Sequence, residues 1–247
     1  MKKRMKFHKM PLFLLITAVI LLLASTVGST QAALTYYSDN FMAEVTVSNI
    51  GVTLLENGKD VSHRNYIDDN RWDDTKQGRL LENLLAEGEK FQPGKRYEET
   101  ISVRNSGAID AYVRVILRKS WSDEQGNKTT KLSPALISLG ITKNSGWVVD
   151  EKATTEEQIV LYYSSIVPSE GETPVCVDSI SVDDSILDQV IKTEKDGVIT
   201  YTYAYNGYSF QLEAEVQAVQ THNAEDAIKS AWGRDVSVDE AGQLQLM

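Results

Sequence analysis

A strict alternation of apolar and polar residues between positions 210 and 218 constrains the fold of this chain more than any other feature. The apolar members are Phe210, Leu212, Ala214, Val216 and Ala218, and glutamine or glutamate occupies every position between them. Side chains of a β-strand point alternately to opposite faces, so the pattern predicts a strand with one buried and one solvent-exposed face. Such a strand is typical of an antiparallel sheet that is packed on one side.

Other segments are rich in β-branched and aromatic residues and are separated by turn-forming residues. They are residues 42–55, 97–103, 111–117, 159–166, 174–182 and 197–205. Asn105-Ser106-Gly107 predicts a turn, and Asn206-Gly207 predicts a hairpin just before the alternating strand. About seven or eight short strands predict a mainly β protein, an antiparallel β-sandwich of Ig-like or jelly-roll type, with one domain over residues 33–233.

Two segments have the spacing of short helices. Residues 79–86 hold leucines at helical spacing, and residues 224–232 place alanines, Ile228 and Trp232 on one face. Asn223 suits the N-cap of the second segment, and Gly233 suits its end. We therefore expect a polar and helical insertion over residues 59–90, a C-terminal helix, and a flexible polar tail over residues 234–247.

The first 32 residues have the order of a secretory signal peptide. Residues 1–9 are basic, residues 11–24 are apolar and uncharged, and small or polar residues follow. The apolar run is shorter than the ~20 residues of a membrane-spanning helix, and an uncleaved anchor is the alternative. Thr30 and Ala32 suit positions −3 and −1 of a cleavage site. The sequence thus predicts cleavage between Ala32 and Ala33 and a secreted protein of the extracellular matrix or cell surface.

The rest of the chain is acidic and contains one cysteine. Five of the 25 basic residues and none of the 35 acidic residues lie in the first 32 positions, so the remainder carries a net charge of −15. This charge repels phosphate and disfavours a nucleic-acid partner. Because Cys176 is the single cysteine, no intramolecular disulfide can form. Its apolar neighbours predict a buried, unreactive thiol.

Several segments, in the same order along the chain, resemble the TasA/camelysin family of exported Gram-positive proteins. The segments are Ala33-Leu34-Thr35-Tyr36-Tyr37-Ser38-Asp39, Phe91-Gln92-Pro93-Gly94, Asn105-Ser106-Gly107, Ala111-Tyr112-Val113-Arg114-Val115, the strand 212–220, Asn223-Ala224 and Ala231-Trp232-Gly233. The resemblance implies a jelly-roll-like sandwich that a dedicated signal peptidase releases. It also implies a subunit or accessory component of an extracellular biofilm-matrix fibre.

In the best-known relatives, the N-terminal strand of one subunit inserts into the sheet of the next. An open sheet edge has unpaired N–H and C=O groups that such a strand satisfies, and head-to-tail donation propagates as a filament. The corresponding donor candidate here spans residues 34–47. Its candidate contact residues are Leu34, Tyr36, Tyr37, Phe41, Val45 and Val47. The alternative is that residues 42–55 form the first strand of the protein's own sandwich.

Two other functional classes have less support. The metalloprotease activity of some relatives would need zinc ligands, but no His-Glu-x-x-His is present and only His63 and His222 follow the signal segment. A monomeric surface module that binds calcium or wall glycan is the other alternative. Its acidic candidates are Asp68, Asp69, Asp73 and Asp74, which lack the residue order of a calcium loop. We therefore predict a non-enzymatic protein without a cofactor.

Overall fold

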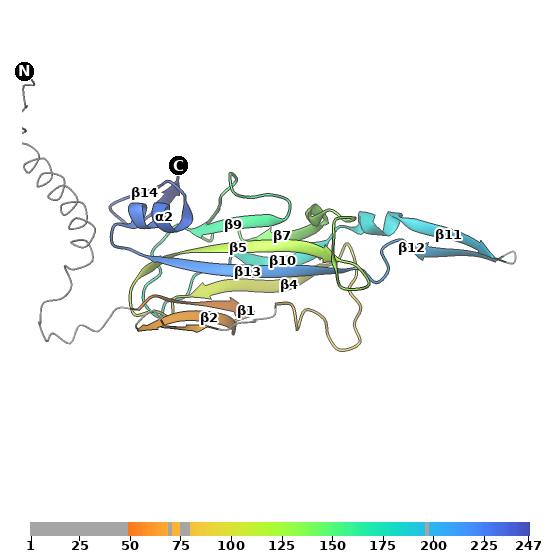
Figure 1. The fold of residues 1–247 in the computed structure, drawn as a ribbon, viewed down its shortest axis with the longest axis horizontal. Coiled ribbons are helices and arrows are strands. Elements are labelled where there is room, and N and C mark those ends of the chain that lie inside the picture. The colour runs from red at the N-terminus through yellow and green to blue at the C-terminus, as the bar shows by residue number, and fades with distance from the viewer. Residues whose placement is uncertain (1–48, 69–70, 75–79, 196–197) are drawn as a thin grey trace, which may run out of the picture. The chain divides into compact units, whose positions relative to one another are not determined.

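Two antiparallel sheets that share a hydrophobic core make up most of the computed structural model, which describes residues 49–68, 71–74, 80–195 and 198–247 (Figure 1). The prediction of a mainly β protein is therefore confirmed. The predicted signal segment, its cleavage site at Ala32 and Ala33, and the donor candidates at 34–47 lie outside the described residues. Asp69 also lies outside them.

The first sheet contains six strands in the order β3-β2-β1-β4-β10-β7. Their bounds are Gly51–Glu56 (β1), Lys59–Asp68 (β2), Arg71–Asp74 (β3), Arg96–Arg104 (β4), Ile137–Ile141 (β7) and Val177–Val182 (β10). β1 and β2 are joined by Asn57 and Gly58, whose φ angles are 51° and 72°. Positive φ at both central residues is the requirement of a tight hairpin turn that follows the twist of the strands, and Asn-Gly meets it.

The second sheet has the order β13-β5-β9-β8, and the short β6 pairs with β5. The bounds are Ala111–Ser122 (β5), Lys128–Thr129 (β6), Trp147–Val149 (β8), Gln158–Tyr163 (β9) and Ser209–Gln220 (β13). Asn105, Ser106 and Gly107 connect β4 of the first sheet to β5 of the second. The turn predicted there thus carries the chain from one sheet to the other, and Asn105 fixes it by donating to the carbonyls of Ile109 and Val167 at 2.8 and 2.9 Å.

The larger hydrophobic cluster takes buried side chains from both sheets. Leu54, Ile101 and Ile180 belong to the first sheet, and Leu117 and Leu161 belong to the second. All five are 3 % exposed or less. Burial of aliphatic side chains on this scale is the main source of stability in a chain without disulfides.

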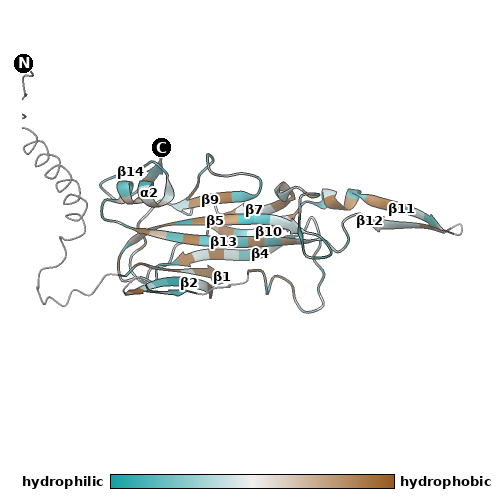
Figure 2. Ribbon diagram, in the orientation of Figure 1, coloured by the Kyte–Doolittle hydropathy of each residue, from teal (hydrophilic) through white to brown (hydrophobic). Residues whose placement is uncertain are grey.

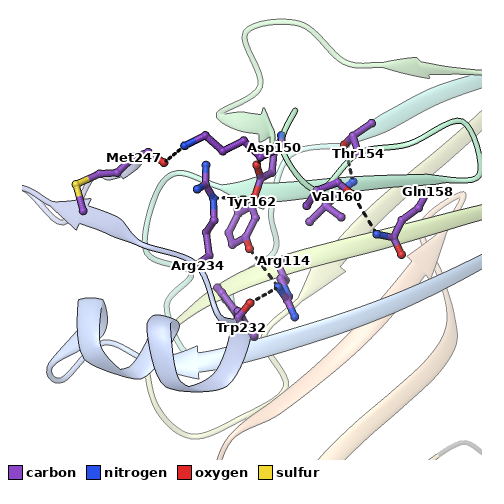
Figure 3. Close-up of polar contacts among 11 residues, drawn as sticks. Arg114, Asp150, Thr154, Gln158, Val160, Tyr162, Trp232, Arg234 and Met247 are labelled. Atoms are coloured by element: carbon purple, nitrogen blue, oxygen red, sulfur yellow. Dashed lines mark hydrogen bonds and ion pairs between the residues drawn. The ribbon is translucent and has the colours of Figure 1, made fainter.

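A smaller cluster lies on the other side of β5 and β9, under α2 (Ala224–Trp232) and a hairpin of β14 (Val236–Val238) and β15 (Leu244–Leu246). The predicted C-terminal helix is confirmed, and Gly233 ends it with φ 66°. The prediction of a flexible tail is wrong, because Val236 and Leu244 are buried in this cluster. Two polar contacts also hold the tail (Figure 3): Arg234 Nε lies 2.8 Å from Asp150 Oδ2, and Lys152 Nζ donates to the Met247 carbonyl at 2.9 Å.

The expectation for residues 59–90 is wrong in two respects. Residues 59–68 and 71–74 form strands of the first sheet rather than a polar insertion, and the described part of the leucine-rich segment, from residue 80, contains no helix. Leu81 has φ 67°, which a right-handed helix does not allow. Its leucines nevertheless pack against the larger core, so helical spacing here reflects burial along an irregular chain.

The hairpin predicted at Asn206-Gly207 is also absent. β12 (Val198–Tyr203) pairs with β11 (Val190–Lys195) instead, and β13 pairs with β5. The Asn206-Gly207 turn therefore connects two different sheets. The short 3₁₀ helices Pro134–Leu136 and Asp184–Asp188 complete the described elements.

Candidate functional site

β13 has one paired and one open edge. It pairs with β5 along its whole length, from Ser209 opposite Ser122 to Gln220 opposite Ala111. Among the described strands, none pairs with its other edge. Figure 2 shows apolar and polar residues interspersed along this strand, which matches the predicted alternation.

The hydrogen-bond pattern identifies the backbone groups at the open edge. The Lys119 N–H of β5 donates to the Glu157 carbonyl, on the side of β9. Because successive residues of a strand direct their N–H and C=O to opposite edges, the even-numbered residues of β5 face β13. In the observed register they bond the odd-numbered residues of β13. The N–H and C=O groups of Ala214, Val216 and Ala218 therefore point to the open edge.

A groove of about 450 Å³ lies beside this edge. One wall is β13, the other is formed by β1, β2 and β3, and the end of α2 closes one side. The lining residues are Ile50, Val52, Arg64, Trp72, Glu215, Val216, Gln217, Ala218, Ala231 and Trp232. The groove thus has the unpaired backbone edge of β13 on one side and side chains of the first sheet on the other.

Aromatic side chains give the wall of β2 and β3 an apolar surface. Trp72 is 43 % exposed, the Arg64 guanidinium lies 4.6 Å from its ring centroid, and the Tyr66 ring contacts its edge at 5.2 Å. Cation–π and edge-to-face contacts hold such a ring in place while one face stays accessible. A large exposed aromatic residue beside an open strand edge is typical of an interaction site.

The chain enters the domain at this groove. Asn49 and Ile50 accept backbone hydrogen bonds from Ala108 (2.8 Å) and Tyr66 (2.9 Å), and Ile50 also lines the groove. Gly51 and Gly107 pack backbone to backbone here. A Cβ on Gly51 would lie 2.9 Å from the Gly107 nitrogen and 2.5 Å from Asn65 Oδ1, so only glycine fits. Residues 49–51 are therefore fixed beside the groove.

At one end the groove is closed by α2, and Arg114 holds that end in place (Figure 3). Its Nε donates to Gln217 Oε1 of β13 at 2.8 Å, and its Nη1 donates to the Tyr162 hydroxyl at 3.1 Å and the Trp232 carbonyl at 3.4 Å. The guanidinium also lies 5.0 Å from the centroid of the Trp232 ring. One half-buried cation thus ties β5, β9, β13 and the last residue of α2 together.

The opposite end of β13 is covered by the leucine-rich segment, which we define as residues 80–91. The Phe91 ring lies 5.1 Å from that of Phe210, at the start of β13. Glu56, at the end of β1, accepts a hydrogen bond from the Leu81 N–H at 2.6 Å. The segment thus leaves the groove open only beside the second half of β13.

Two buried carboxyl groups hold this segment. Glu99 is 1 % exposed and hydrogen-bonds to Glu56, which is 8 % exposed. Burial, followed by the hydrogen bond and the negative charge of Glu56, raises the pKa of Glu99 to about 7. Asn57 Nδ2 donates to Glu99 at 3.1 Å and opposes that increase. Below about pH 7 Glu99 therefore keeps its proton beside Glu56, whose Oε1 accepts the Leu81 N–H.

The described candidates for metal binding, Asp68, Asp73 and Asp74, do not gather into a metal site. Asp73 and Asp74 lie on the exposed strand β3, and His63 Nε2 contacts Asp73 Oδ2 at 3.3 Å. In the part of the chain that is described, no three histidine, cysteine or acidic residues are placed to hold a metal ion. Asp68 belongs to β2. Cys176 is fully buried, as predicted, and burial raises the pKa of its thiol to about 12.

Sequence reasoning missed the wall formed by β2 and β3. Arg64 and Trp72 fall in the range that was interpreted as a polar insertion. The signal that identifies them is Asn57-Gly58, which directly follows the apolar run of β1 and requires a second strand. The pairing of β2 with β1 places Arg64 opposite Val52 and so makes this arginine part of the groove wall.

Comparisons with protein-family models, curated proteins and solved structures found no match. Within the described ranges, no helix is long and apolar enough to cross a membrane. The geometry of the groove therefore carries the functional argument.

Proposed function

We propose that this chain is a secreted structural protein that forms extracellular fibres by accepting the N-terminal strand of another copy beside β13. The observation that carries the proposal is the open edge of β13 above a partly apolar groove. An incoming strand would bond the N–H and C=O groups of Ala214, Val216 and Ala218 and would extend the second sheet. In this proposal the two sheets form a jelly-roll-like sandwich that the donated strand completes.

The proposed donor, residues 34–47, suits the groove in length and pattern. Fourteen extended residues span about 46 Å, which is more than the ~20 Å of the open second half of β13 requires. The second half of the donor alternates most clearly: Phe41, Ala43, Val45 and Val47 lie on one face, and Met42, Glu44 and Thr46 lie on the other. Over residues 41–47 a strand with this pattern turns an apolar face to the groove and a more polar face to water.

In this proposal, removal of the signal peptide during secretion determines when assembly can begin. The basic, apolar and small-residue order of residues 1–32 is that of a signal peptide, and cleavage before Ala33 frees the donor. We propose that a dedicated signal peptidase makes this cut, as the family resemblance implies. Because donor and acceptor are different surfaces, the contact is head-to-tail and continues as a filament.

Electron microscopy and light scattering on two purified chains test the proposal. One chain starts at Ala33, and the other starts at Asn49, whose carbonyl still caps the turn at Ala108. We expect filaments from the first and no filaments from the second. If both remain folded monomers at high concentration, or both form filaments, the proposal is wrong.

Two matched substitutions within the donor sharpen this test. Val45→Asp places a charge on the apolar face and should prevent filaments, whereas Thr46→Asp places the same charge on the opposite face and should permit them. Equal effects of the two changes would contradict strand insertion with this register.

A second candidate function is a surface module that binds wall glycan. It is favoured by a separate cavity of about 340 Å³ whose lining includes Tyr203, Tyr205, Tyr208 and Phe210. Aromatic rings of this kind stack on sugar rings. Co-sedimentation with insoluble cell-wall polymer tests it: Tyr208→Ala should abolish binding, and Val45→Asp should leave binding unchanged.

A further inference from the structure

The hairpin of β11 and β12 is a two-stranded sheet that extends away from the two larger sheets (Figure 1). The strands pair only with each other, from Val190 opposite Tyr203 to Lys195 opposite Val198. Two-stranded sheets are marginally stable in water, and a third or fourth strand stabilises them. Both outer edges of this sheet remain unpaired within the described residues.

Large apolar side chains are exposed along this hairpin. Tyr201 is 64 % exposed, Tyr203 54 %, Ile191 51 %, Val190 50 % and Ile199 47 %. The register places Val190, Ile199, Tyr201 and Tyr203 on one face of the hairpin. Figure 2 shows hydrophobic residues at the start of β11 and hydrophilic residues toward its end. Lys192, opposite Tyr201, and Glu194, opposite Ile199, lie on this face too, so exposed apolar side chains surround one basic and one acidic residue. Exposed apolar side chains gathered on a protruding element are typical of a protein interface.

The charges of β11 specify which strand its outer edge accepts. Lys192 and Glu194 lie two residues apart and therefore on the same face. If β11 pairs antiparallel with β11 of a second copy around Thr193, each Lys192 lies opposite a Glu194. Charged side chains at a strand edge disfavour partners that do not match them, and opposite charges directly across two strands attract. In this register the matching strand is β11 itself.

We propose that β11 pairs with β11 of a second copy in this register and forms a continuous four-stranded sheet. The contact is symmetric and therefore closes as a pair. It would join the apolar faces of the two hairpins and satisfy the backbone groups of both β11 edges. This contact is independent of the groove beside β13, and in a fibre it would connect neighbouring filaments laterally.

Charge exchange tests the pairing by sedimentation equilibrium. The chain starts at Ala33 and carries Val216→Pro, which removes an N–H from the open edge of β13 and so prevents the proposed fibre contact. K192E and E194K should each weaken dimerisation at least tenfold, because like charges then face each other twice. The double variant K192E/E194K should dimerise like the parent.

Mixing the two single variants gives the decisive result. In a mixed pair both facing positions again carry opposite charges, so a heterodimer should form with the affinity of the parent dimer. A monomeric parent at all concentrations, or single variants that dimerise like the parent, would overturn the proposal. Because this outcome does not depend on filaments, it separates the hairpin contact from the proposed function.

Cross-linking reports the register itself. T193C places two thiols opposite each other at the symmetry axis, within the distance that a disulfide requires, and should form a covalent dimer under mild oxidation. T202C, on β12 and away from the axis, is the matched control and should form no disulfide-linked dimer. Cys176 does not interfere because it is buried. Equal cross-linking of both variants would contradict the register.

Discussion

β5 and β13 lie side by side and have the same length, yet their surroundings differ. β5 is paired on both edges, with β13 and β9, and nine of its twelve residues are buried. β13 is paired on one edge, and only Leu212 and Val219 are buried. The sequences differ accordingly: six of the first seven residues of β5 are apolar, whereas β13 alternates with glutamine and glutamate.

This difference shows how composition marks the position of a strand in a sheet. A strand with neighbours on both edges and both faces contacts little water and can be apolar throughout. A strand at an edge keeps polar side chains and leaves a row of backbone groups without partners. In this protein those groups belong to Ala214, Val216 and Ala218, beside the groove. The alternation that predicted the strand thus also marks the proposed interaction edge.

The largest expected effect comes from truncation of matched leucines in the two strands. Leu117 of β5 is fully buried, and Leu212 of β13 is 8 % exposed at the edge of the same cluster. Leu117→Ala should lower the free energy of unfolding by about 4 kcal/mol, and Leu212→Ala by about 2 kcal/mol, because the edge can relax around the smaller cavity. Urea denaturation measures both. Equal losses would contradict the difference in packing between the strands.

Proline substitutions in β13 separate its two edges. Glu213→Pro removes an N–H that bonds β5 and should destabilise the monomer by about 3 kcal/mol. Val216→Pro removes an N–H at the open edge and should lower stability by about 1 kcal/mol, yet prevent filaments. Thermal unfolding and light scattering follow the two effects. Similar destabilisation by both prolines would show that the second edge is already paired in the monomer.

The pH dependence of stability tests how Glu99 and Glu56 hold the leucine-rich segment over the Phe210 end of β13. Because the folded protein raises the pKa of Glu99 to about 7, it holds a proton that the unfolded chain releases near its usual value of 4.5. The free energy of unfolding should therefore fall as pH rises from about 4.5 to about 7. Glu99→Gln keeps a neutral donor toward Glu56. It should match the parent at pH 4.5 and exceed it by about 2 kcal/mol at pH 8.

The neighbouring Glu98 is the control for this prediction. It lies on the same strand with an exposed side chain, so Glu98→Gln should leave the pH profile unchanged. The protection factor of the Leu81 amide against hydrogen exchange should fall above pH 7 in the parent and stay constant in Glu99→Gln. A flat pH profile of stability in the parent would contradict the raised pKa of Glu99.

The sequence predicts the positions of strands that have strong apolar patterns, but it does not predict which strands pair with each other. Residues 97–103, 111–117 and 210–218 were predicted within a few residues, since burial itself produces their patterns. Asn206-Gly207 was interpreted as a hairpin, although Asn57-Gly58 forms the hairpin of β1 and β2. The two dipeptides are identical, and only long-range pairing decides which one joins partners.

The candidate site was predictable only in part. The edge character of β13 is visible in its alternation, but the wall of Arg64 and Trp72 depends on β2, whose ten residues are mostly polar. The tail was misjudged for the same reason, because two apolar residues, Val236 and Leu244, suffice to bury it against α2. Such sparse contacts depend on tertiary packing and leave little trace in local sequence.

Hydrogen exchange of the β13 amides tests the central claim most directly. In the monomer that starts at Asn49, the amides of Ala214, Val216 and Ala218 should exchange quickly, and those of Glu213, Glu215 and Gln217 should be protected by β5. In filaments of the chain that starts at Ala33, both sets should be protected. The account is contradicted if the even-numbered amides are already protected in the monomer, or remain unprotected in filaments.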